Sequence, residues 1–291
     1  VLLTVSLGCM ADSPKGAKPA AVQSAKAAPV NVVPQINVIP RPAKVQAGEG
    51  EFVITAKTQI VCNKLFRKEA EYLRDRIKTA TGWNLGISEA APSDDAINLL
   101  QNRSCNLWNA ERYTLEVSAK RVVMIGESPA GIFHGIQTLR QLLPVEIESA
   151  KPVLDVRWVV PGVKIQDNPR YEWRGLMIDE GRHFFGKAYV KQILEQMALR
   201  KMNVFHWHLT DMPGWRIEIK AWPKLATVGG KGDDTDPNGP VKYYTQDDIR
   251  EIVAYAKARH IMVVPEIDMP GHATAANRAY PEFSGGGSKK H

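Results

Sequence analysis

Three short apolar segments in the second half of the chain each end in side chains that can bind a ligand or transfer a proton. Their ends read DEGRH at 179–183, HWHLTD at 206–211 and EIDMPGH at 266–272. Packing alone gives a strand no reason to end in ionisable groups, so three such ends in succession predict one polar site. Carboxylates, imidazoles and a guanidinium are suited to acid–base chemistry, sugar binding or metal coordination.

The elements that must position these groups are predicted from the spacing of the apolar residues. Residues 175–178, 203–209 and 261–265 have the composition of short buried strands. Apolar residues at helical spacing lie between 189 and 202 and again after the sequence TQDD at 245–248, which predicts a capping box at a helix start. The alternation of strands and helices predicts a parallel sheet whose carboxyl ends face one mouth.

The first half of the chain has a different pattern, and residues 36–168 are predicted to form a small α+β domain of their own. Two amphipathic helices are expected, around 66–77 and 132–143, and Pro144 stops the second. The expected strands are 52–55, 59–62, 96–100, 113–117 and 122–125. Residues 169–291 then form the second domain.

The N-terminal segment suggests export. Residues 1–9, VLLTVSLGC, resemble the tail of a bacterial lipoprotein signal, in which Cys9 would carry the lipid; the alternative is a chance hydrophobic stub. This run is too short to span a bilayer. Residues 10–35 are rich in Ala, Lys, Pro and Ser and are predicted to be a disordered tether. We therefore expect an exported bacterial protein, periplasmic or a lipoprotein of the outer membrane or cell surface, that meets a membrane only through this anchor.

Composition narrows the class of protein further. The 291 residues are 44% hydrophobic with a net charge of +7, which is typical of a globular protein with a mildly basic surface. Lys and Arg form no run or stripe, so we expect no nucleic-acid partner. Cys62 and Cys105 could pair in an exported protein, although buried free thiols are favoured. The chain starts at Val1 and ends in SGGGSKKH, and we expect both ends to be cut.

Several longer segments resemble the family 20 glycoside hydrolases, which include the β-N-acetylhexosaminidases. They are RGLMIDEGRHFF at 174–185, KMNVFHWHLTD at 201–211, GWRIE at 214–218 and VPEIDMPGH at 264–272. In addition, GIFHGIQTLR at 131–140 is similar to the last helix of the small domain that precedes the barrel in this family. The resemblance implies a small α+β domain followed by the first three βα units of a TIM (β/α)₈ barrel.

The resemblance also implies roles for four residues. Arg182 matches an arginine that binds hydroxyls of the terminal sugar, which suits the forked guanidinium. Asp211 matches an acid at the rim of the same pocket. Asp268 and His272 match a pair behind the catalytic acid/base, where the carboxylate orients the imidazole and stabilises its protonated form. The implied substrates are β-linked N-acetylhexosamine glycans, and no cofactor is implied.

The mechanism implied by the resemblance is substrate-assisted and retaining. The 2-acetamido carbonyl oxygen attacks the anomeric carbon, a glutamate protonates the leaving oxygen, and the preceding aspartate orients the acetamido group. Family members carry this Asp–Glu pair on a later strand, so we expect it outside these residues and expect the chain alone to be inactive. The adjacent Asp179 and Glu180 are interpreted as a coincidence, because Glu180 departs from the family pattern.

Two other functions stay open. His206 and His208 lie at i and i+2 on a predicted strand and therefore share a face, so they could hold zinc in a metal-dependent hydrolase on the same barrel, with Asp211 or His272 as further ligands. The resemblance instead implies a packed, hydrogen-bonded floor without metal at this position. The other alternative is a surface glycan-binding lipoprotein that keeps the sugar pocket and has no catalytic activity.

Overall fold

The computed structural model describes residues 36–102 and 110–284. Cys9, Cys105 and the predicted tether lie outside the described residues, so the predictions that concern them stay predictions. Cys62 is a buried free thiol. Within the described ranges, no helix has the length and apolar character needed to cross a bilayer.

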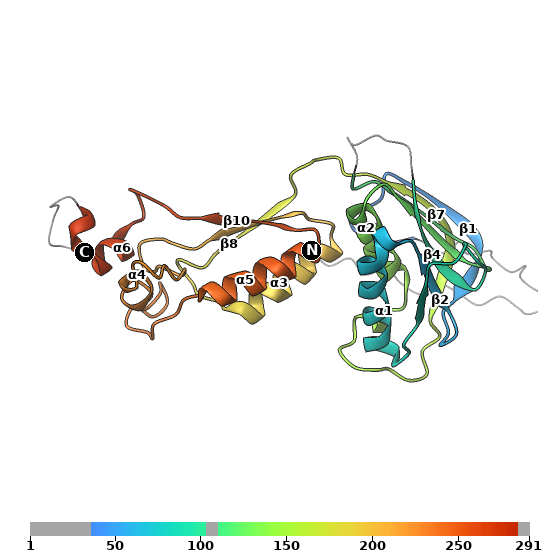
Figure 1. The fold of residues 1–291 in the computed structure, drawn as a ribbon, viewed down its shortest axis with the longest axis horizontal. Coiled ribbons are helices and arrows are strands. Elements are labelled where there is room, and N and C mark those ends of the chain that lie inside the picture. The colour runs from blue at the N-terminus through green and yellow to red at the C-terminus, as the bar shows by residue number, and fades with distance from the viewer. Residues whose placement is uncertain (1–35, 103–109, 285–291) are drawn as a thin grey trace, which may run out of the picture. The chain divides into compact units, whose positions relative to one another are not determined.

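The first domain is a mixed seven-stranded sheet in the order β1-β7-β5-β6-β4-β2-β3, with helices α1 and α2 on one face (Figure 1). The strands β2, β3, β4 and β6 are parallel, and β5, β7 and β1 complete the sheet in antiparallel pairs. The strands are β1 Lys44–Val53, β2 Gln59–Cys62, β3 Gly86–Ser88, β4 Ala96–Gln101, β5 Tyr113–Val117, β6 Val122–Gly126 and β7 Val159–Asp167.

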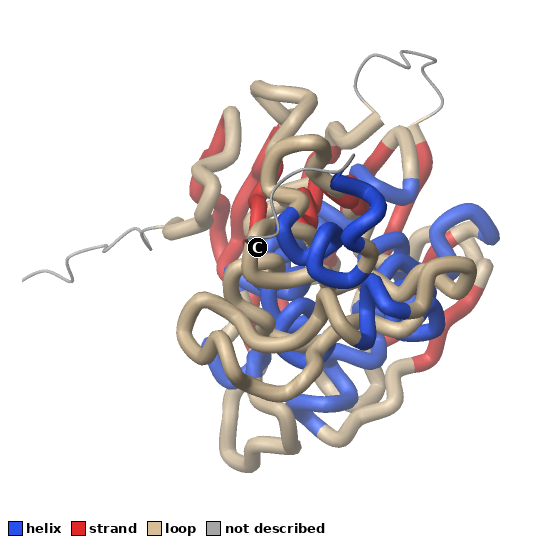
Figure 2. The backbone as a smooth tube through the Cα atoms, turned by 90° about the vertical axis from the view of Figure 1, so that its left-hand side faces the viewer, coloured by secondary structure: helices blue, strands red, loops and turns tan. Residues whose placement is uncertain are grey.

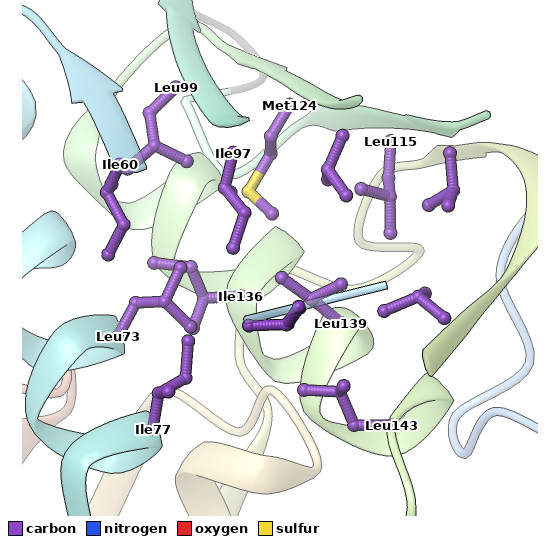
Figure 3. Packing of buried hydrophobic residues seen from close by; sticks show 14 of the residues in the cluster. Ile60, Leu73, Ile77, Ile97, Leu99, Leu115, Met124, Ile136, Leu139 and Leu143 are labelled. Carbon is purple, nitrogen blue, oxygen red and sulfur yellow. The ribbon is translucent and has the colours of Figure 1, made fainter. Parts of the chain in front are cut away.

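Helices α1 (Arg67–Thr81) and α2 (Pro129–Leu142) cover the sheet because each has a continuous apolar face. Gly82 ends α1 in the left-handed conformation, at φ 79°, and Ser128 caps the start of α2 with its side chain. The core between helices and sheet is aliphatic, as Figure 3 shows for residues of α1, α2 and the central strands. Two short 3₁₀ helices, Lys64–Phe66 and Val145–Glu148, flank these helices.

The second domain starts with three parallel strands in the order β10-β9-β8, which are β8 Gly175–Asp179, β9 Val204–His208 and β10 Met262–Glu266. Helices α3 (Lys187–Leu199) and α5 (Gln246–Lys257) lie side by side along these strands (Figure 1). The predicted capping box is present, with Thr245 as the N-cap of α5 and Asp248 completing it. This is a partial, TIM-barrel-like α/β unit after a small α+β domain, as the sequence predicts.

The segment between β9 and α5 is long and mostly irregular. It contains a one-turn helix, α4 (Lys224–Thr227), although it is otherwise loop, drawn in tan in Figure 2. After β10 the chain forms α6 (Thr274–Ala279) and a 3₁₀ turn, Pro281–Ser284. A small apolar cluster joins Trp215 and Leu225 to α6 and Tyr280, so this loop has a core of its own. The loop is thereby held beside the ends of the three strands.

Candidate active site

The register of the three parallel strands places three polar side chains at the same level. Asp179 pairs with His208, and His208 pairs with Glu266, in adjacent strands. Paired residues in parallel strands project to the same face of a sheet. The carboxyl ends therefore bring these three side chains together, and His208 lies in the middle with its Nδ1 2.9 Å from Glu266 Oε2.

Asp211, in the turn after β9, is the most shared group of the site. It is fully buried, and its Oδ2 lies 3.0 Å from His208 Nε2, 2.7 Å from Arg182 Nη2 and 3.5 Å from His272 Nδ1. Its Oδ1 accepts a hydrogen bond of 2.6 Å from the backbone N–H of Met212. A buried carboxylate is stable only with such partners. Asp211 thus joins all three strand ends.

Arg182 is held from two sides and still reaches solvent. Its guanidinium contacts Asp179 through one nitrogen and Asp211 through the other, and its backbone N–H donates to Asp179 Oδ1 at 2.9 Å. The side chain remains 39% exposed. A guanidinium that two carboxylates orient in this way can present its remaining N–H groups to paired hydroxyls of a bound molecule.

Asp268 and His272 form a hydrogen-bonded pair after β10. His272 Nδ1 lies 3.0 Å from Asp268 Oδ2, and the backbone N–H of Asp268 donates to Thr210 Oγ1 at 3.0 Å. The hydrogen bond from His272 lowers the pKa of Asp268. The His272 side chain is 47% exposed, so the ring is open to a ligand or to another protein group. The structure therefore brings Arg182, Asp211 and this pair to one end of the strands.

His206 and His208 point to one face, as their spacing predicts, and both contact the same carboxylate. His206 Nε2 lies 2.5 Å from Glu266 Oε2, the oxygen that also contacts His208. Among the residues that the structure describes, two sets have ligand atoms close enough for a metal ion, namely Asp179, His208 and Asp211, and His208, Glu266 and Asp268. In both sets His208 would have to give up a hydrogen bond with a carboxylate in order to bind an ion. We interpret the arrangement as a hydrogen-bonded network.

Glu180 does not join the cluster, although it is adjacent to Asp179. It is fully buried, accepts a hydrogen bond of 2.7 Å from Tyr244 Oη, and accepts another of 2.8 Å from the backbone N–H of Phe185. Burial raises its pKa, and these hydrogen bonds partly offset the effect. Its partners tie the end of β8 to the segment before α5, which is a packing role.

Arg216 is a supporting residue that the analysis of strand ends missed. It is fully buried and donates only to backbone carbonyls, including those of Glu180 at 2.9 Å, Gly181 at 3.1 Å and Gly232 at 2.7 Å. A Cβ on Gly214 would lie 2.1 Å from its Nη2, which explains the glycine there. Arg216 thus holds the backbone next to Arg182 against the long loop. The segment GWRIE contained the signal, although nothing in it shows which atoms the arginine binds.

Asp179 and Glu266 are also part of the site, although sequence reasoning assigned them no role. Their position could have indicated a role, since each is the first residue of a polar run at a strand end. What the sequence does not show is the strand order, which puts β9 in the centre and makes His208 the neighbour of both.

The four tryptophans of this half divide between buried Trp207 and Trp215 and exposed Trp173 and Trp222.

Comparison with known families matches both domains. The family model described as glycosyl hydrolase family 20, catalytic domain, matches residues 171–291, and the model for domain 2 of the same family matches residues 35–168. Together they include all the candidate site residues that the structure describes.

Curated relatives and solved structures agree with these matches. The chain is 41% identical over 254 residues to a beta-hexosaminidase of Porphyromonas gingivalis, covering 86% of this chain and 32% of that protein. A beta-N-acetylhexosaminidase of Cellulomonas fimi is 35% identical, with 88% of this chain and 50% of that protein covered. The structure of a Streptomyces plicatus N-acetyl-beta-hexosaminidase in complex with Thio-NAglucal superposes with a TM-score of 0.78 at 41% identity, covering 88% of this chain and 50% of that one. The chain thus spans a third to a half of the length of these relatives.

Proposed function

Because this chain belongs to glycosyl hydrolase family 20, we propose that the protein containing it is an exo-acting β-N-acetylhexosaminidase. Its substrates are β-linked glycans that end in N-acetylglucosamine or N-acetylgalactosamine. Relatives that support this proposal are named beta-hexosaminidase and N,N'-diacetylchitobiase, and one similar structure, of a Streptomyces plicatus enzyme, holds the product GlcNAc.

The single observation that carries the proposal is the environment of Arg182. Carboxylates from two different strand ends orient its guanidinium, and 39% of the side chain is exposed at the mouth of the site. Such a fork binds the vicinal hydroxyls of a terminal sugar ring, with each N–H donating to a hydroxyl oxygen. Binding of the terminal sugar by this fork would explain exo action, because the remainder of the glycan must then point away from Arg182.

The Asp268–His272 pair fits the second half of the reaction. In the proposed mechanism the acetamido oxygen of the substrate attacks the anomeric carbon, and a glutamate on a later strand protonates the leaving oxygen. Asp268 orients the His272 ring through the hydrogen bond at Nδ1, so the ring can present its other nitrogen to that glutamate and tune its acidity. The chain supplies sugar binding and this supporting pair, and the Asp–Glu pair comes from the part of the barrel beyond it.

The test is hydrolysis of aryl N-acetyl-β-glucosaminide and aryl N-acetyl-β-galactosaminide by the full-length gene product and by the 291-residue chain. We expect turnover by the former and none by the latter. Arg182→Ala should lower kcat/KM by orders of magnitude, whereas Arg200→Ala, which removes an exposed arginine before β9, should leave it unchanged. Binding of N-acetylglucosamine without turnover would favour the glycan-binding alternative, and bound zinc that His206→Ala releases would favour the metal-dependent one.

We also propose that Cys9 anchors the protein to a membrane. The residues before it form an apolar run that ends in Gly-Cys, and a polar tether of 26 residues would separate the anchor from the folded domains. Mass spectrometry of the protein from its native host should find a diacylglycerol on Cys9. A protein secreted in free form, with an unmodified Cys9, would contradict this proposal.

A further inference from the structure

His208 contacts a carboxylate with each of its two ring nitrogens. Nε2 lies 3.0 Å from Asp211 Oδ2, and Nδ1 lies 2.9 Å from Glu266 Oε2. A neutral imidazole has one N–H and one lone pair, so it would place its lone pair against one of these oxygens. Only the doubly protonated ring donates on both sides. Since His208 is 5% exposed, solvent has little access to either contact.

The surroundings of His208 need a positive charge. Its neighbours on β8, on β10 and in the following turns are mainly carboxylates, and Arg182 is the permanent cation among them. The titratable and charged groups that face it from the packed elements, or lie next to those that do, are Asp179, Asp211, Glu266, Asp268, Arg182, His206 and His272. Four carboxylates with a single guanidinium would repel one another strongly in a partly buried site.

Electrostatics and burial act on His208 in opposite directions. Burial alone would lower the pKa of His208, but the hydrogen bonds with Glu266 and Asp211 and the charge of Asp179 outweigh it and raise the pKa. The doubly protonated ring, which can donate to both carboxylates at these distances, is thus also the form that the charges favour.

We propose that His208 is a positioning residue that carries a fixed positive charge, joins Asp211 to Glu266 and thereby keeps Arg182 oriented for the sugar. Its effect reaches the sugar through Asp211, whose Oδ2 also contacts Arg182 Nη2 at 2.7 Å. Without the imidazolium, Asp211 would lose its partner at Nε2 of His208, and one of the two carboxylates that orient Arg182 would be held less firmly. This inference rests on the proposed function of the same site and deepens it.

The charge state can be measured directly in the 291-residue chain. Nitrogen-15 NMR of histidine-labelled protein distinguishes doubly protonated from neutral rings, and His208→Gln identifies the signal of His208. We expect both ring nitrogens to be protonated at neutral pH, with a titration midpoint above the ordinary histidine value of about 6.5. A neutral ring at neutral pH, or a midpoint below about 6.5, would overturn the proposal. If His208→Gln fails to fold, sequential backbone assignment of the unmodified chain identifies the His208 signal instead.

Kinetics of the full-length protein give a second readout. His208→Gln should lower kcat/KM roughly 10- to 100-fold, as expected when a hydrogen bond to a charged group is lost, and mainly through KM. The imidazolium of His208 loses a proton as the pH rises, so the alkaline decline in kcat/KM that this loss causes should disappear in the variant. His260→Gln, which changes a histidine that contacts Glu69 just before β10, is the matched control and should leave both kcat/KM and the pH profile unchanged. A uniform loss of activity with an unchanged pH profile would reduce His208 to a packing residue.

The two proposals can fail separately. If the full-length protein hydrolyses no hexosaminide and the NMR titration still shows a protonated His208, the proposed function is wrong and the charge assignment stands. If the full-length protein hydrolyses a hexosaminide and His208 is neutral, the proposed function stands and the charge assignment is wrong.

Discussion

The two ends of the barrel strands both carry charged clusters, and the clusters are built differently. At the amino ends, charges are paired with specific partners across the domain junction: Lys201 Nζ lies 2.8 Å from Asp167 Oδ2, and Arg174 Nη2 lies 2.6 Å from Glu111 Oε2. At the carboxyl ends, one oxygen of Asp211 serves three different side chains. In the first arrangement, Arg174 and Lys201 each have a carboxylate partner of their own. In the second, Arg182, His208 and His272 share one carboxylate.

The difference shows which cluster is structural. Lys201 is buried, at 6% exposed, and also donates to Tyr113 Oη at 2.8 Å, so its charge is already paired within the protein. Arg182 and His272 remain 39% and 47% exposed. Buried ion pairs add little net stability but are expensive to break, whereas shared and accessible charges can exchange a partner for substrate. We therefore expect mutations at the two ends to separate stability from activity.

The largest effect is expected from Arg182→Ala in the full-length protein. Loss of two charge-assisted hydrogen bonds to the sugar should lower kcat/KM roughly 10²- to 10⁴-fold. Initial rates on an aryl N-acetyl-β-glucosaminide measure this. Unfolding in urea should change less than in Lys201→Met, because the Arg182 side chain is partly exposed and the buried Asp211 keeps His208 and the Met212 N–H as partners. An Arg182→Ala variant with unchanged kcat/KM would contradict the functional role of the cluster at the carboxyl ends of the strands.

Lys201→Met should have the opposite profile. It leaves Asp167 and Tyr113 without their cation, and removing one partner of a buried pair costs about 3–5 kcal/mol. Urea unfolding of the 291-residue chain measures the loss, and Lys201→Met combined with Asp167→Asn should recover part of it. Sugar binding by the folded fraction should be unchanged. A stable Lys201→Met variant that has lost sugar binding would contradict the division.

Two histidines should give opposite pH dependences of stability. Burial and the nearby Arg174 and Lys201 lower the pKa of His134 to about 3, because the folded domain excludes the proton. Its stabilising contribution is complete above the unfolded pKa of about 6.5 and declines by up to about 1.4 kcal/mol per pH unit as the pH falls toward the folded value. The raised pKa of His208 has the reverse sign, so that contribution is lost as the pH rises through its folded value.

The free energy of unfolding in urea, measured from acid to mildly alkaline pH, checks both pH dependences. His134→Gln should flatten the loss of stability on the acid side, and His208→Gln should flatten the decline on the alkaline side. The control His183→Gln should alter neither slope. Identical slopes in all three variants would show that neither ring senses its surroundings as described.

The smallest effect is expected from the start of α5. The Thr245 side chain accepts from the Asp248 N–H at 3.1 Å, and Thr245→Ala should cost about 1 kcal/mol, as is usual for N-caps. Thr79→Ala, at a half-buried position inside α1, is the comparison. Since α5 lies away from the strand ends, kcat/KM of the full-length protein should be unaffected by either change.

Local patterns predicted most of the elements, and the misses have a common cause. Helices α1, α2 and α5 and strands β4, β5 and β6 lie within a few residues of their predicted limits, because their periodicity and caps are local features. The sequence of β1, KVQAGEGEFV, alternates poorly and contains a register shift between Ala47 and Glu51, so only its last residues were predicted. Strand β7 was missed entirely; its pairing with β1 and β5 stabilises it over long sequence distances.

The sequence by itself determined the kinds of group at the site and their place at the ends of three parallel strands. It placed Arg182, Asp211, Asp268 and His272 there because strand ends and loop residues are encoded in short, local runs. Only the tertiary structure decided that β9 lies between β8 and β10, that Glu180 turns into the packed interior and that Arg216 binds carbonyls of distant loops. It also surrounds His208 with carboxylates from both neighbours. A charge state depends on what other segments bring near, and no run of residues along the chain contains that information.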